Sequence, residues 1–418
     1  MHFAEREVRS LVLSSKPLYP PRGGSSLRNW QNISALRKLG PVAAFSVQDA
    51  SNASLESEPP GLEWSRSHRV VRSKSGGLAT AIARYRWICD PVGHPFAAGL
   101  FTQTHLFELS GLVKEFQPEL VLLEEPWMHP YLDSLNGAES IVFDAHDVQA
   151  RLRKEMAASE RGFSRLRKIA TARRARVVEG GLVRRANQVW ACSSGDAKAL
   201  GELYAPVGPV RVVPNAVDVG YYADVASRTV QDGSCDNDAR RRTVLFVGNF
   251  SYLPNAEAAE ALFAEVYPRL CAHSPDWRVM LVGVQPSRAM IEAAQRDSRI
   301  VVTGMVEDVR PYLAQAGVVV VPLRSGGGTR IKILEAFAAR VPVVSTTKGV
   351  EGIDARDHEH LLVADEISTM VDHVLALAAD DELRDRLINS AFRLVNESYS
   401  WDAIERNVQA AVRSMPLG

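Results

Sequence analysis

The stretch VVVVPLRSGGGTRIKILEAFAARVPVVSTT, residues 318–347, decides how this chain folds. It begins with an apolar run, passes through three glycines, continues with the apolar spacing of a helix, and ends in a second apolar run. A buried strand, a turn, a helix and another buried strand form one β-α-β unit, which requires a parallel sheet. Parallel strands carry ligand-binding loops at their carboxyl ends, so SGGGTR is expected at such an edge.

Apolar runs of the same kind recur through the second half of the chain. Each is rich in Val, Leu and Ile, as expected for strands buried on both faces of a sheet. The predicted strands are residues 243–249, 278–283, 300–304, 318–323, 341–347 and 360–365. Helical patterns lie between them, so this half is predicted to form a doubly wound parallel sheet.

The first half repeats this alternation less regularly. Its predicted strands are residues 9–15, 42–47, 119–125, 140–147, 188–194 and 210–215. We therefore predict an α/β protein with two Rossmann-like doubly wound domains facing across a cleft. The predicted parts are an N-terminal domain (1–215), a polar interdomain linker (216–243), a C-terminal domain (244–395) and a C-terminal helix (396–418) that crosses back to the first domain.

Composition narrows the class of protein. Of the 418 residues, 46% are hydrophobic and 23% are charged, and the formal net charge is zero, which argues against a nucleic-acid partner. No apolar run approaches the ~20 residues of a membrane helix, and the N-terminus lacks the features of a signal peptide. The four cysteines are scattered, which argues against a zinc site or disulfides and indicates a cytoplasmic protein.

One segment departs from this charge balance. Residues 151–185 contain twelve Arg and Lys residues and three acidic residues, a local charge of +9. This helical stretch is a candidate for peripheral contact with an anionic membrane at its inner face, or with the diphosphate of a lipid-linked acceptor. A solvated helical face explains the same pattern.

The glycine-rich turn has the composition of an anion site. Without side chains, Gly326, Gly327 and Gly328 let backbone N–H groups approach a phosphate closely, and Thr329 continues the turn. Arg330 and Lys332 add positive charges suited to phosphate oxygens. The alternative is a plain turn with surface charges.

Glu335 extends this pattern by one helical turn. It lies three residues after Lys332, so the two share a helix face, and a carboxylate there accepts hydrogen bonds from vicinal hydroxyls. The group therefore suits a ribose diphosphate. The spacing matches neither G-x-G-x-x-G nor G-x-x-x-x-G-K-[ST], which argues against a dinucleotide oxidoreductase and a P-loop ATPase.

At this point the chain resembles the family-4 glycosyltransferases (glycosyl transferases group 1), which are retaining, nucleotide-sugar-dependent enzymes of GT-B fold. The resemblance rests on segments of both halves, listed here with their positions: FVGNFSYLPN (246–255), LVGVQP (281–286), VVTGMVEDVRPYLAQAGVVVVPL (301–323), GGGTRIKILEAFAARVPVVSTTKGVEG (326–352), HLLVAD (360–365), PPRGGSSLRNWQNISALRKLG (20–40), FDAHD (143–147) and VVPNAVD (212–218).

The chain departs from the family pattern at one carboxylate. The family often carries a Glu, seven residues and a second Glu; Glu335 matches the second, which holds the nucleotide ribose, and Gly327 stands at the first. The sequence thus resembles a branch with GGGTRxKxLEA in this place. The family's diphosphate-clamping cations are also absent after residue 248, so Arg330 and Lys332 are expected to take over that neutralisation.

The resemblance also implies further site residues. Gly23 and Gly24 are expected near the donor phosphates and the acceptor, and His146 beside the transferring sugar. Glu124 and Glu125 are expected on the acceptor side. Three residues are implied at the nucleotide: Gly248 near the donor, and Met305 and Val306 at the base.

The implied reaction moves a sugar from a nucleotide-diphosphate sugar to a hydroxyl acceptor, which is a glycan, a lipid-linked molecule or a small molecule, with retention. His146, Arg330 and Lys332 are the catalytic candidates. No metal and no cofactor is expected, because no Asp-rich motif stands out. Polysaccharide biosynthesis is the expected setting. Two alternatives stay open: a nucleotide-sugar epimerase or hydrolase of the same fold, and a non-catalytic nucleotide-sugar-binding subunit of a glycan-assembly complex.

Overall fold

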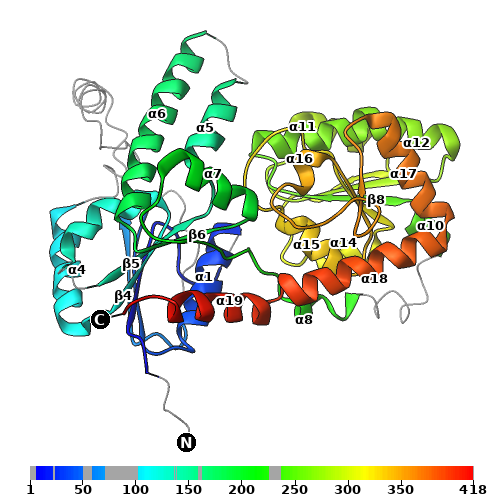
Figure 1. The fold of residues 1–418 in the computed structure, drawn as a ribbon. Helices are drawn as coiled ribbons and strands as arrows, with labels where there is room; N and C mark the ends of the chain where they lie inside the picture. Colours follow the sequence, from blue (N-terminus) through cyan, green and yellow to red (C-terminus); the bar gives the residue numbers. More distant parts are fainter. Residues whose placement is uncertain are drawn as a thin grey trace, which may run out of the picture. The chain divides into compact units, whose positions relative to one another are not determined.

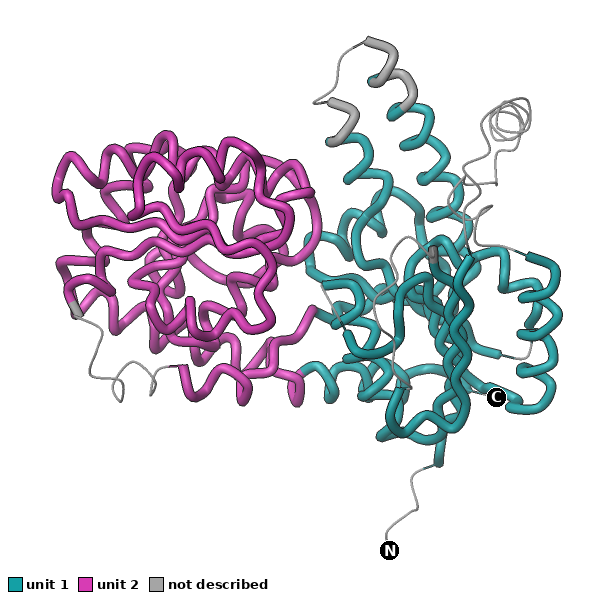
Figure 2. Tube along the Cα trace, turned by 180° about the vertical axis from the view of Figure 1, so that it is seen from behind, with its two compact units in different colours: residues 1–214, 404–418 teal, residues 215–403 magenta. Residues whose placement is uncertain are grey.

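The computed structural model describes residues 6–21, 24–49, 59–70, 102–135, 137, 139–158, 162–225 and 237–417. The chain forms two compact units (Figure 2): unit 1 comprises residues 1–214 and 404–418, and unit 2 comprises residues 215–403. Of the predicted linker, residues 226–236 lie outside the described residues, and Asn237–Arg241 form helix α10.

Unit 1 is built on a parallel sheet of seven strands in the order β3-β2-β1-β4-β5-β6-β7 (Figure 1). The strands are β1 (Ser10–Ser14), β2 (Val42–Asp49), β3 (Trp64–Val70), β4 (Leu120–Glu124), β5 (Ser140–Ala145), β6 (Gln188–Ala191) and β7 (Val210–Val212). All six predicted strands of this half are confirmed. Strand β3 is the one that the sequence did not predict.

The helices of unit 1 connect these strands. They are α1 (Gly24–Leu36), α4 (Gln103–Phe116), the 3₁₀ helix η2 (Pro126–Ser134), α5 (Gln149–Ala158), α6 (Gly162–Arg185) and α7 (Ser194–Tyr204). Helices α5 and α6 form a hairpin that extends beyond the sheet (Figure 1). The final helix, α19 (Trp401–Arg413), joins this unit from Ile404 onward, and the side chain of Gln188 donates to the carbonyl oxygen of Ala411 at 3.2 Å.

Unit 2 contains a second parallel sheet, of six strands in the order β10-β9-β8-β11-β12-β13. The strands are β8 (Thr243–Val247), β9 (Arg278–Val282), β10 (Ile300–Val302), β11 (Val318–Val321), β12 (Val343–Ser345) and β13 (Leu362–Val363). Each lies within a predicted run, so the predicted fold class of two parallel-sheet α/β units is confirmed.

Two helices of unit 2, α8 (Val219–Tyr222) and α10, precede β8, and the others lie between or after the strands. These others are α11 (Leu253–Ala261), the π-helical η3 (Leu262–Val266), α12 (Tyr267–His273), α13 (Arg288–Arg296), α14 (Arg310–Gln315), α15 (Ile331–Ala338), α16 (Thr347–Val350), α17 (Ile367–Ala379) and α18 (Asp381–Ser398). Among the described residues, none of these helices, and none in unit 1, has the length and apolar character that a bilayer crossing demands.

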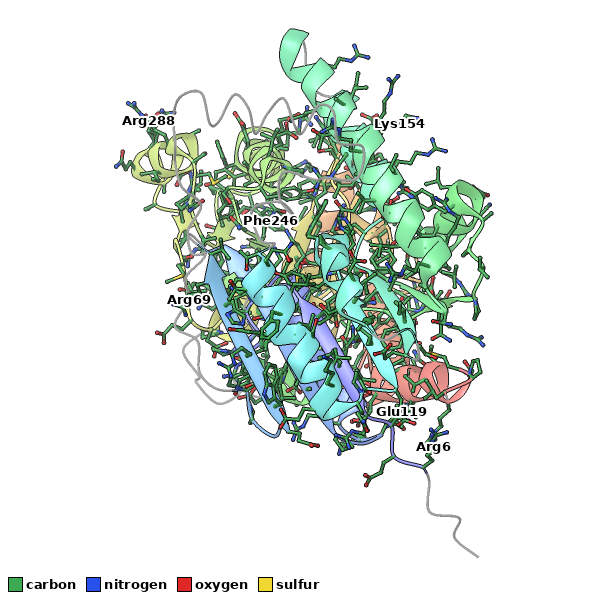
Figure 3. All side chains as sticks on the ribbon, turned by 90° about the vertical axis from the view of Figure 1, so that its left-hand side faces the viewer. Arg6, Arg69, Glu119, Lys154, Phe246 and Arg288 are labelled. Carbon is green, nitrogen blue, oxygen red and sulfur yellow. The ribbon has the colours of Figure 1, made fainter. Side chains whose placement is uncertain are left out.

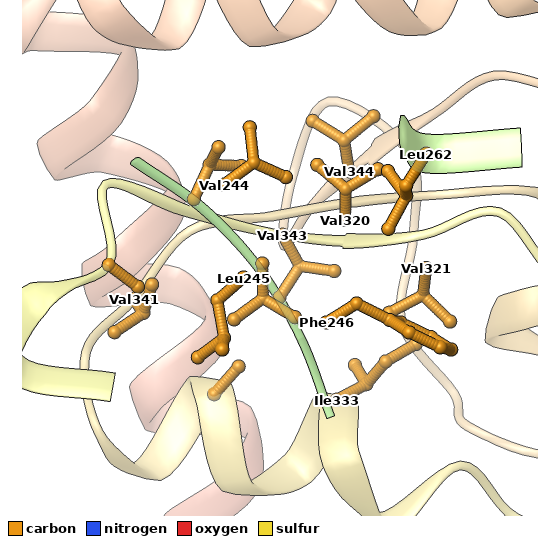
Figure 4. Close-up of a cluster of buried hydrophobic side chains, with 14 of the residues drawn as sticks. Val244, Leu245, Phe246, Leu262, Val320, Val321, Ile333, Val341, Val343 and Val344 are labelled. Atoms are coloured by element: carbon orange, nitrogen blue, oxygen red, sulfur yellow. The ribbon is translucent and has the colours of Figure 1, made fainter. Parts of the chain in front are cut away.

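The core of unit 2 explains why its strands are apolar along their whole length. Val244, Leu245 and Phe246 of β8 pack with the valines of β11 and β12, and Ile333 of α15 reaches the same cluster (Figure 4). All of these side chains are almost fully buried. Alternate side chains of a strand point to opposite faces, so a continuous apolar run indicates burial on both.

Both sheets have a point where the strand order reverses. In unit 1 it lies between the neighbours β1 and β4, and in unit 2 between β8 and β11. At such a point the loops that follow two adjacent strands turn to opposite sides of the sheet, which opens a crevice at the carboxyl ends. The predicted site residues can now be placed against these two positions.

Candidate functional site

In unit 1, four charged side chains gather at the reversal point; we call them the carboxylate–imidazole cluster: Arg28, Glu124, Asp144 and His146. Glu124 is the last residue of β4, Asp144 lies near the end of β5, and His146 follows that strand. Arg28 comes from α1, the helix after β1. The side chains of Arg28, Glu124 and Asp144 are almost fully buried, and His146 is 9% exposed.

Arg28 is the fixed cation of the cluster. Its Nε donates to Asp144 Oδ2 at 2.7 Å and its Nη2 to Asp144 Oδ1 at 2.5 Å, a bidentate pair, while Nη1 donates to the carbonyl of Val213 at 2.7 Å. Burial alone would raise the pKa of Asp144, but the guanidinium outweighs it and holds this pKa well below its usual range. Asp144 is therefore a carboxylate at all moderate pH values.

His146 lies between carboxylates. Its Nε2 is 2.9 Å from Glu124 Oε2 and 3.3 Å from Asp144 Oδ2, and its Nδ1 is 3.9 Å from Glu125 Oε1. Burial would lower the pKa of His146, yet the carboxylates of Asp144 and Glu124 outweigh it and raise this pKa to about 10. At neutral pH the ring is an imidazolium, which donates hydrogen bonds and cannot accept a proton.

Glu124 completes the balance of charge. Burial and the neighbouring Asp144 carboxylate raise the pKa of Glu124 to about 7, although the bond from His146 opposes this. Asn32 of α1 donates to Glu124 Oε1 at 3.1 Å and to Asp144 Oδ2 at 2.9 Å. With two cations and two carboxylates, the cluster is neutral when every member is ionised, which is how buried charges are tolerated.

The cluster also contains a set of atoms close enough for a metal ion. One ligand atom from each of Glu124, Asp144 and His146 lies within 4.8 Å of the others. Arg28, however, engages both oxygens of Asp144 and already supplies positive charge there, so a metal ion would have to compete with it. The chemistry of this group therefore favours internal neutralisation over a metal.

The backbone is strained beside the cluster. Glu125 has φ +75° and ψ 147°, a conformation that residues other than glycine rarely adopt. Its carboxylate accepts a hydrogen bond from Ser15, lies 3.9 Å from Lys16 Nζ and faces His146. Strain of this kind persists where surrounding contacts impose it, and it is concentrated at functional sites.

The other predicted residues of unit 1 can be placed only in part. Gly24 begins α1, and Gly23 lies outside the described residues. Arg28 and Asn32 were not predicted. They lie four residues apart, so they share one face of α1, and this buried polar face is the signal that could have identified them.

In unit 2, the segment between β11 and α15 forms the glycine loop, residues 326–330. Gly326 has φ +102° and Gly328 φ +78°, which side chains disfavour. A Cβ on Gly326 would also lie 2.7 Å from the hydroxyl of Tyr252. The loop therefore needs glycine at both positions for its backbone path.

Arg330 binds the inner side of the glycine loop. Its guanidinium donates to the carbonyl oxygens of Gly326, at 2.9 Å, Gly327 and Gly328, and the side chain is buried. In a trans peptide the C=O and N–H groups point in opposite directions. The N–H groups of Gly327, Gly328 and Thr329 belong to the same three peptides and therefore point away from the guanidinium.

This set of donors has the character of an anion site. In the described part of the chain, the N–H groups of Gly327, Gly328 and Thr329 have no hydrogen-bond acceptor, and the buried Oγ1 of Thr329 is also without a partner. N–H groups without an acceptor, in a glycine-rich turn that leads into a helix, are suited to binding an anion. The prediction that Arg330 itself contacts phosphate stays a prediction.

Lys332 is the second residue of α15, and its side chain reaches strand β8 and the start of helix α11. Its Nζ donates to Asn255 Oδ1 at 2.9 Å and lies 4.0 Å from the centre of the Phe246 ring. Burial lowers the pKa of Lys332 to about 7, and the nearby Arg330 charge acts in the same direction, while Glu335 opposes it. An anion placed against this ammonium would restore its charged form.

Glu335 is held by a residue that the sequence did not single out. Its Oε1 accepts a hydrogen bond from the Tyr222 hydroxyl at 2.9 Å. Burial raises the pKa of Glu335, although the bond from Tyr222 and the charge of Lys332 oppose this. Glu335 lies in the first turns of α15, after the glycine loop, and one of its two carboxylate oxygens is held by Tyr222 of α8.

The remaining predicted nucleotide residues lie at the ends of other strands. Gly248 directly follows β8, and a Cβ there would lie 3.1 Å from Asn255 and 3.3 Å from Lys332 Nζ, so a side chain would crowd the ammonium. Met305 and Val306 follow β10: Met305 is 78% exposed, and Val306 packs against the core. The structure thus brings Gly248 to Lys332 and places Met305 and Val306 two strands away.

Comparison with known proteins supports a fold of two parallel-sheet α/β units. Residues 241–380, which are 140 of the 418 residues, match the family model described as Glycosyl transferases group 1. An uncharacterized 44.6 kDa protein in the cps region of Klebsiella pneumoniae is 22% identical over 169 residues. That match covers 39% of this chain and 44% of the relative, so it spans less than half of the relative's length.

Solved structures resemble the whole chain. Sucrose-phosphate synthase from Thermosynechococcus elongatus superposes with a TM-score of 0.69 at 18% identity, covering 98% of both chains. Anabaena Alr3699/HepE in complex with UDP gives 0.65 at 13% identity, over 97% of this chain and 100% of that one. The trehalose 6-phosphate synthase from Burkholderia multivorans gives 0.61 at 16% identity, over 98% and 97%. At such identities the likeness shows the fold, which is GT-B.

The strained backbone of Glu125 generates a first prediction. Replacing Glu125 with Ala or with Gly removes the same carboxylate, but only Gly is free of the steric cost at φ +75°. We expect Glu125→Gly to be more stable than Glu125→Ala by about 1 kcal/mol. Hydrogen exchange of the β4 and β5 amides in the full chain measures this difference. An Ala variant as stable as the Gly variant would show that the backbone is relaxed.

The imidazolium generates a second prediction. A raised pKa stabilises the fold fully below the unfolded value near 6.5, and this stabilisation is lost as the pH rises through about 10. We compare Glu124→Gln with the double variant Glu124→Gln/His146→Gln, because the first change removes the carboxyl that titrates near pH 7. The stability that His146 adds in this pair should decline from pH 7 to 10.

Urea unfolding at several pH values, with pulsed hydrogen exchange to follow unit 1 alone, measures this decline. A difference between the two variants that is constant from pH 7 to 10 would show that the ring is neutral in the folded protein.

Proposed function

We propose that the protein is a glycosyltransferase that moves a sugar from a nucleoside-diphosphate sugar to a hydroxyl acceptor with retention of anomeric configuration. The observation that carries the proposal is the set of groups at the β8–β11 reversal point: the N–H groups of residues 327–329, which have no acceptor among the described residues, the Lys332 ammonium and the Glu335 carboxylate. They lie in the segment that matches the group 1 glycosyl transferase model.

The donor is proposed to bind along this set. Its diphosphate accepts hydrogen bonds from the N–H groups of residues 327–329 and from Lys332, and the dipole of α15 adds to the attraction. The ribose hydroxyls donate to Glu335, whose second oxygen is not engaged by Tyr222. Met305 and Val306 are proposed to contact the base, and Gly248 leaves room for the diphosphate beside Lys332.

The main catalytic requirement is to stabilise the leaving group. Cleavage of the bond between the anomeric carbon and the phosphate oxygen leaves a negative charge on the diphosphate, which Lys332 and the loop donors are proposed to stabilise. These groups supply the positive potential without a metal ion or a cofactor. Arg330 is proposed to hold the loop carbonyls so that the three N–H groups face the diphosphate, with its charge behind them.

His146 is proposed to act as a hydrogen-bond donor to a substrate hydroxyl. Its protonated state excludes it as the base at neutral pH. A phosphate oxygen of the departing diphosphate is proposed to take the acceptor's proton, while the acceptor attacks from the face that the diphosphate leaves. The acceptor is a glycan, a lipid-linked molecule or a small molecule, and Gly23, Gly24, Glu124 and Glu125 are proposed to lie near it.

We also propose a cytoplasmic location with peripheral membrane contact, and a place in polysaccharide biosynthesis. The scattered cysteines support the cytoplasmic location, and the cationic segment 151–185 supports the membrane contact. Neither proposal is needed for the chemistry at the glycine loop.

A donor screen tests the proposed activity. The protein is incubated with UDP-, GDP-, dTDP- and ADP-sugars and acceptor extracts, and we expect one donor to release its nucleoside diphosphate and form a product of unchanged anomeric configuration. Lys332→Met should lower the turnover about 100-fold or more, because it removes a charge that acts on the leaving group. Lys114→Met, at an exposed position of α4, is the matched control and should leave the turnover unchanged.

The same screen separates the alternatives. Interconversion of sugars without release of nucleotide indicates an epimerase, and release of free sugar at all acceptor concentrations indicates a hydrolase. Thermal stabilisation by a nucleotide without turnover indicates a binding subunit. Equal turnover in the wild type and Lys332→Met would disprove the role given to this lysine.

The lowered pKa of Lys332 predicts proton uptake on binding. With a pKa of about 7 the amine is mostly neutral at pH 8, and a bound diphosphate favours the charged form. We expect nucleoside-diphosphate binding at pH 8 to take up about one proton, and the affinity to fall as the pH rises above 7. Calorimetry in buffers of different ionisation enthalpy measures the uptake, which Lys332→Met should abolish. Binding without proton uptake would place the diphosphate away from Lys332.

A further inference from the structure

A groove lies between helices α5, α6 and α7 of unit 1. Figure 1 shows these helices, of which α5 and α6 form the hairpin that extends beyond the sheet. Its volume is about 710 Å³, within the range of sites for small organic ligands. The lining residues are Ala150, Arg151, Lys154, Arg165, Ile169, Ala172, Arg173, Arg176, Ala199, Glu202 and Leu203. No residue of the carboxylate–imidazole cluster or of the glycine loop is among them.

Five of these residues are cations, and one is an acid. Arg151 lies 3.3 Å from Glu155 in the same helix. Lys154, Arg165, Arg173 and Arg176 are exposed, and within the described ranges they form no ion pair. Figure 3 shows Lys154 on this hairpin. The one acidic residue of the lining, Glu202, is paired with Lys198, whose Nζ lies 3.9 Å away, and not with these four cations. The groove therefore presents positive charge to an occupant.

The remaining lining is aliphatic. Ala150, Ile169, Ala172, Ala199 and Leu203 are half-buried, and they line the same groove as the cations. All lining residues lie on helices, whose interior N–H and C=O groups bond within the helix. The groove thus offers cations and aliphatic surface but no free strand edge, so it suits an amphiphile better than the backbone of an extended peptide.

A buried carboxylate fixes the groove's three helices. Glu179 of α6 accepts hydrogen bonds from the N–H groups of Gln149, at 2.7 Å, and Ala150, at 3.1 Å, at the start of α5, and from the Tyr204 hydroxyl of α7 at 2.6 Å. It therefore binds all three helices at one point. In addition, Arg153 stacks at 5.0 Å on the ring of Trp127 in η2, which ties α5 to the body of the unit. The groove is part of a braced structure.

We propose that this groove binds an anionic phospholipid of a bilayer, with the phosphate headgroup among the guanidinium groups of Arg165, Arg173 and Arg176 and an acyl chain against Ile169, Ala172 and Leu203. Charge complementarity selects the anionic headgroup, and the aliphatic surface between the cations selects the chain. The long side chains of arginine can line an apolar wall and still place their charge at a headgroup. The proposal rests on the peripheral membrane contact proposed above and names its ligand, but it does not depend on the reaction that the protein catalyses.

Vesicle binding by the full-length protein tests the headgroup. We expect binding to phosphatidylcholine vesicles that contain phosphatidylglycerol, and little binding to phosphatidylcholine alone. The triple variant R165Q/R173Q/R176Q should lose about 100-fold in affinity, at about fivefold per basic residue. The control variant K38Q/K114Q/R269Q removes three exposed cations elsewhere, so its net charge changes by the same amount. Its affinity for the vesicles should fall by less than about twofold. Equal losses in the two variants would overturn the assignment to this groove.

A second pair of variants tests the acyl chain. Ala172→Phe fills the aliphatic part of the groove, whereas Ala170→Phe places the same ring on an exposed position of α6 outside the lining. We expect Ala172→Phe to weaken vesicle binding at high salt, where headgroup attraction is screened, and Ala170→Phe not to weaken it. Equal binding by both variants would show that no chain enters the groove. Thermal unfolding of each variant confirms that it is folded.

Two soluble competitors complete the test. Inorganic phosphate and a glutamate-rich peptide carry negative charge without an acyl chain. We expect both to compete weakly with phosphatidylglycerol vesicles, and a monoacyl phosphate to compete well. If the peptide displaces the vesicles at equal charge, the groove binds polyanions in general, and the lipid assignment is wrong.

Discussion

All strands of each sheet run in one direction, and this constraint determines where chemistry can occur in this protein. Parallel strands are joined by helices that cover both faces, so the interior of each sheet is apolar and the polar groups gather at the strand ends. Where the strand order reverses, two such ends diverge and leave a crevice. Both clusters of charged residues lie at such a point, one beside β1 and β4 and the other beside β8 and β11.

The two clusters solve the problem of buried charge in different ways. In unit 1 the charges are balanced within the protein: Arg28 engages Asp144 on both oxygens, and His146 lies between Asp144 and Glu124. In unit 2 the balance is incomplete, because burial and Arg330 act together against the charge of Lys332. A balanced group is rigid and pre-organised, whereas an unbalanced cation gains most from a ligand of opposite charge. The second cluster is therefore the stronger candidate for binding an anion.

The sequence predicted the sheets better than it predicted the contacts between side chains. Twelve strands were predicted because a strand buried on both faces leaves an unbroken apolar run. Strand β3 was missed: WSRSHRV is an edge strand that, among the described residues, pairs with β2 alone, none of its side chains is buried, and its polar residues resemble a loop. The glycine-rich turn and the helix after it led to Lys332 and Glu335, and the family resemblance led to Glu124 and His146.

Residues that serve these site residues as partners were not predicted, for a physical reason. Arg28, Asn32, Tyr222 and Asn255 come from helices or loops remote in sequence, and only the packed structure selects them. A polar residue on a helix is ordinarily solvated, so its burial cannot be inferred from its own type. The face of α1 that carries Arg28 and Asn32 is an exception. These two polar residues lie four apart, which is the spacing of a buried helix face, so their burial could have been inferred from the sequence.

The Arg330 guanidinium supports the backbone of the glycine loop from its inner side. Composition suggests that an arginine beside three glycines meets a phosphate directly. In the structure the guanidinium lies against the carbonyl oxygens of Gly326, Gly327 and Gly328, and its predicted contact with a phosphate stays a prediction. Each carbonyl is thereby oriented, and the planarity of the peptide orients the N–H group on the opposite side. A fixed fork of donors can engage several carbonyl oxygens at once, so an arginine suits this position better than the single ammonium of a lysine.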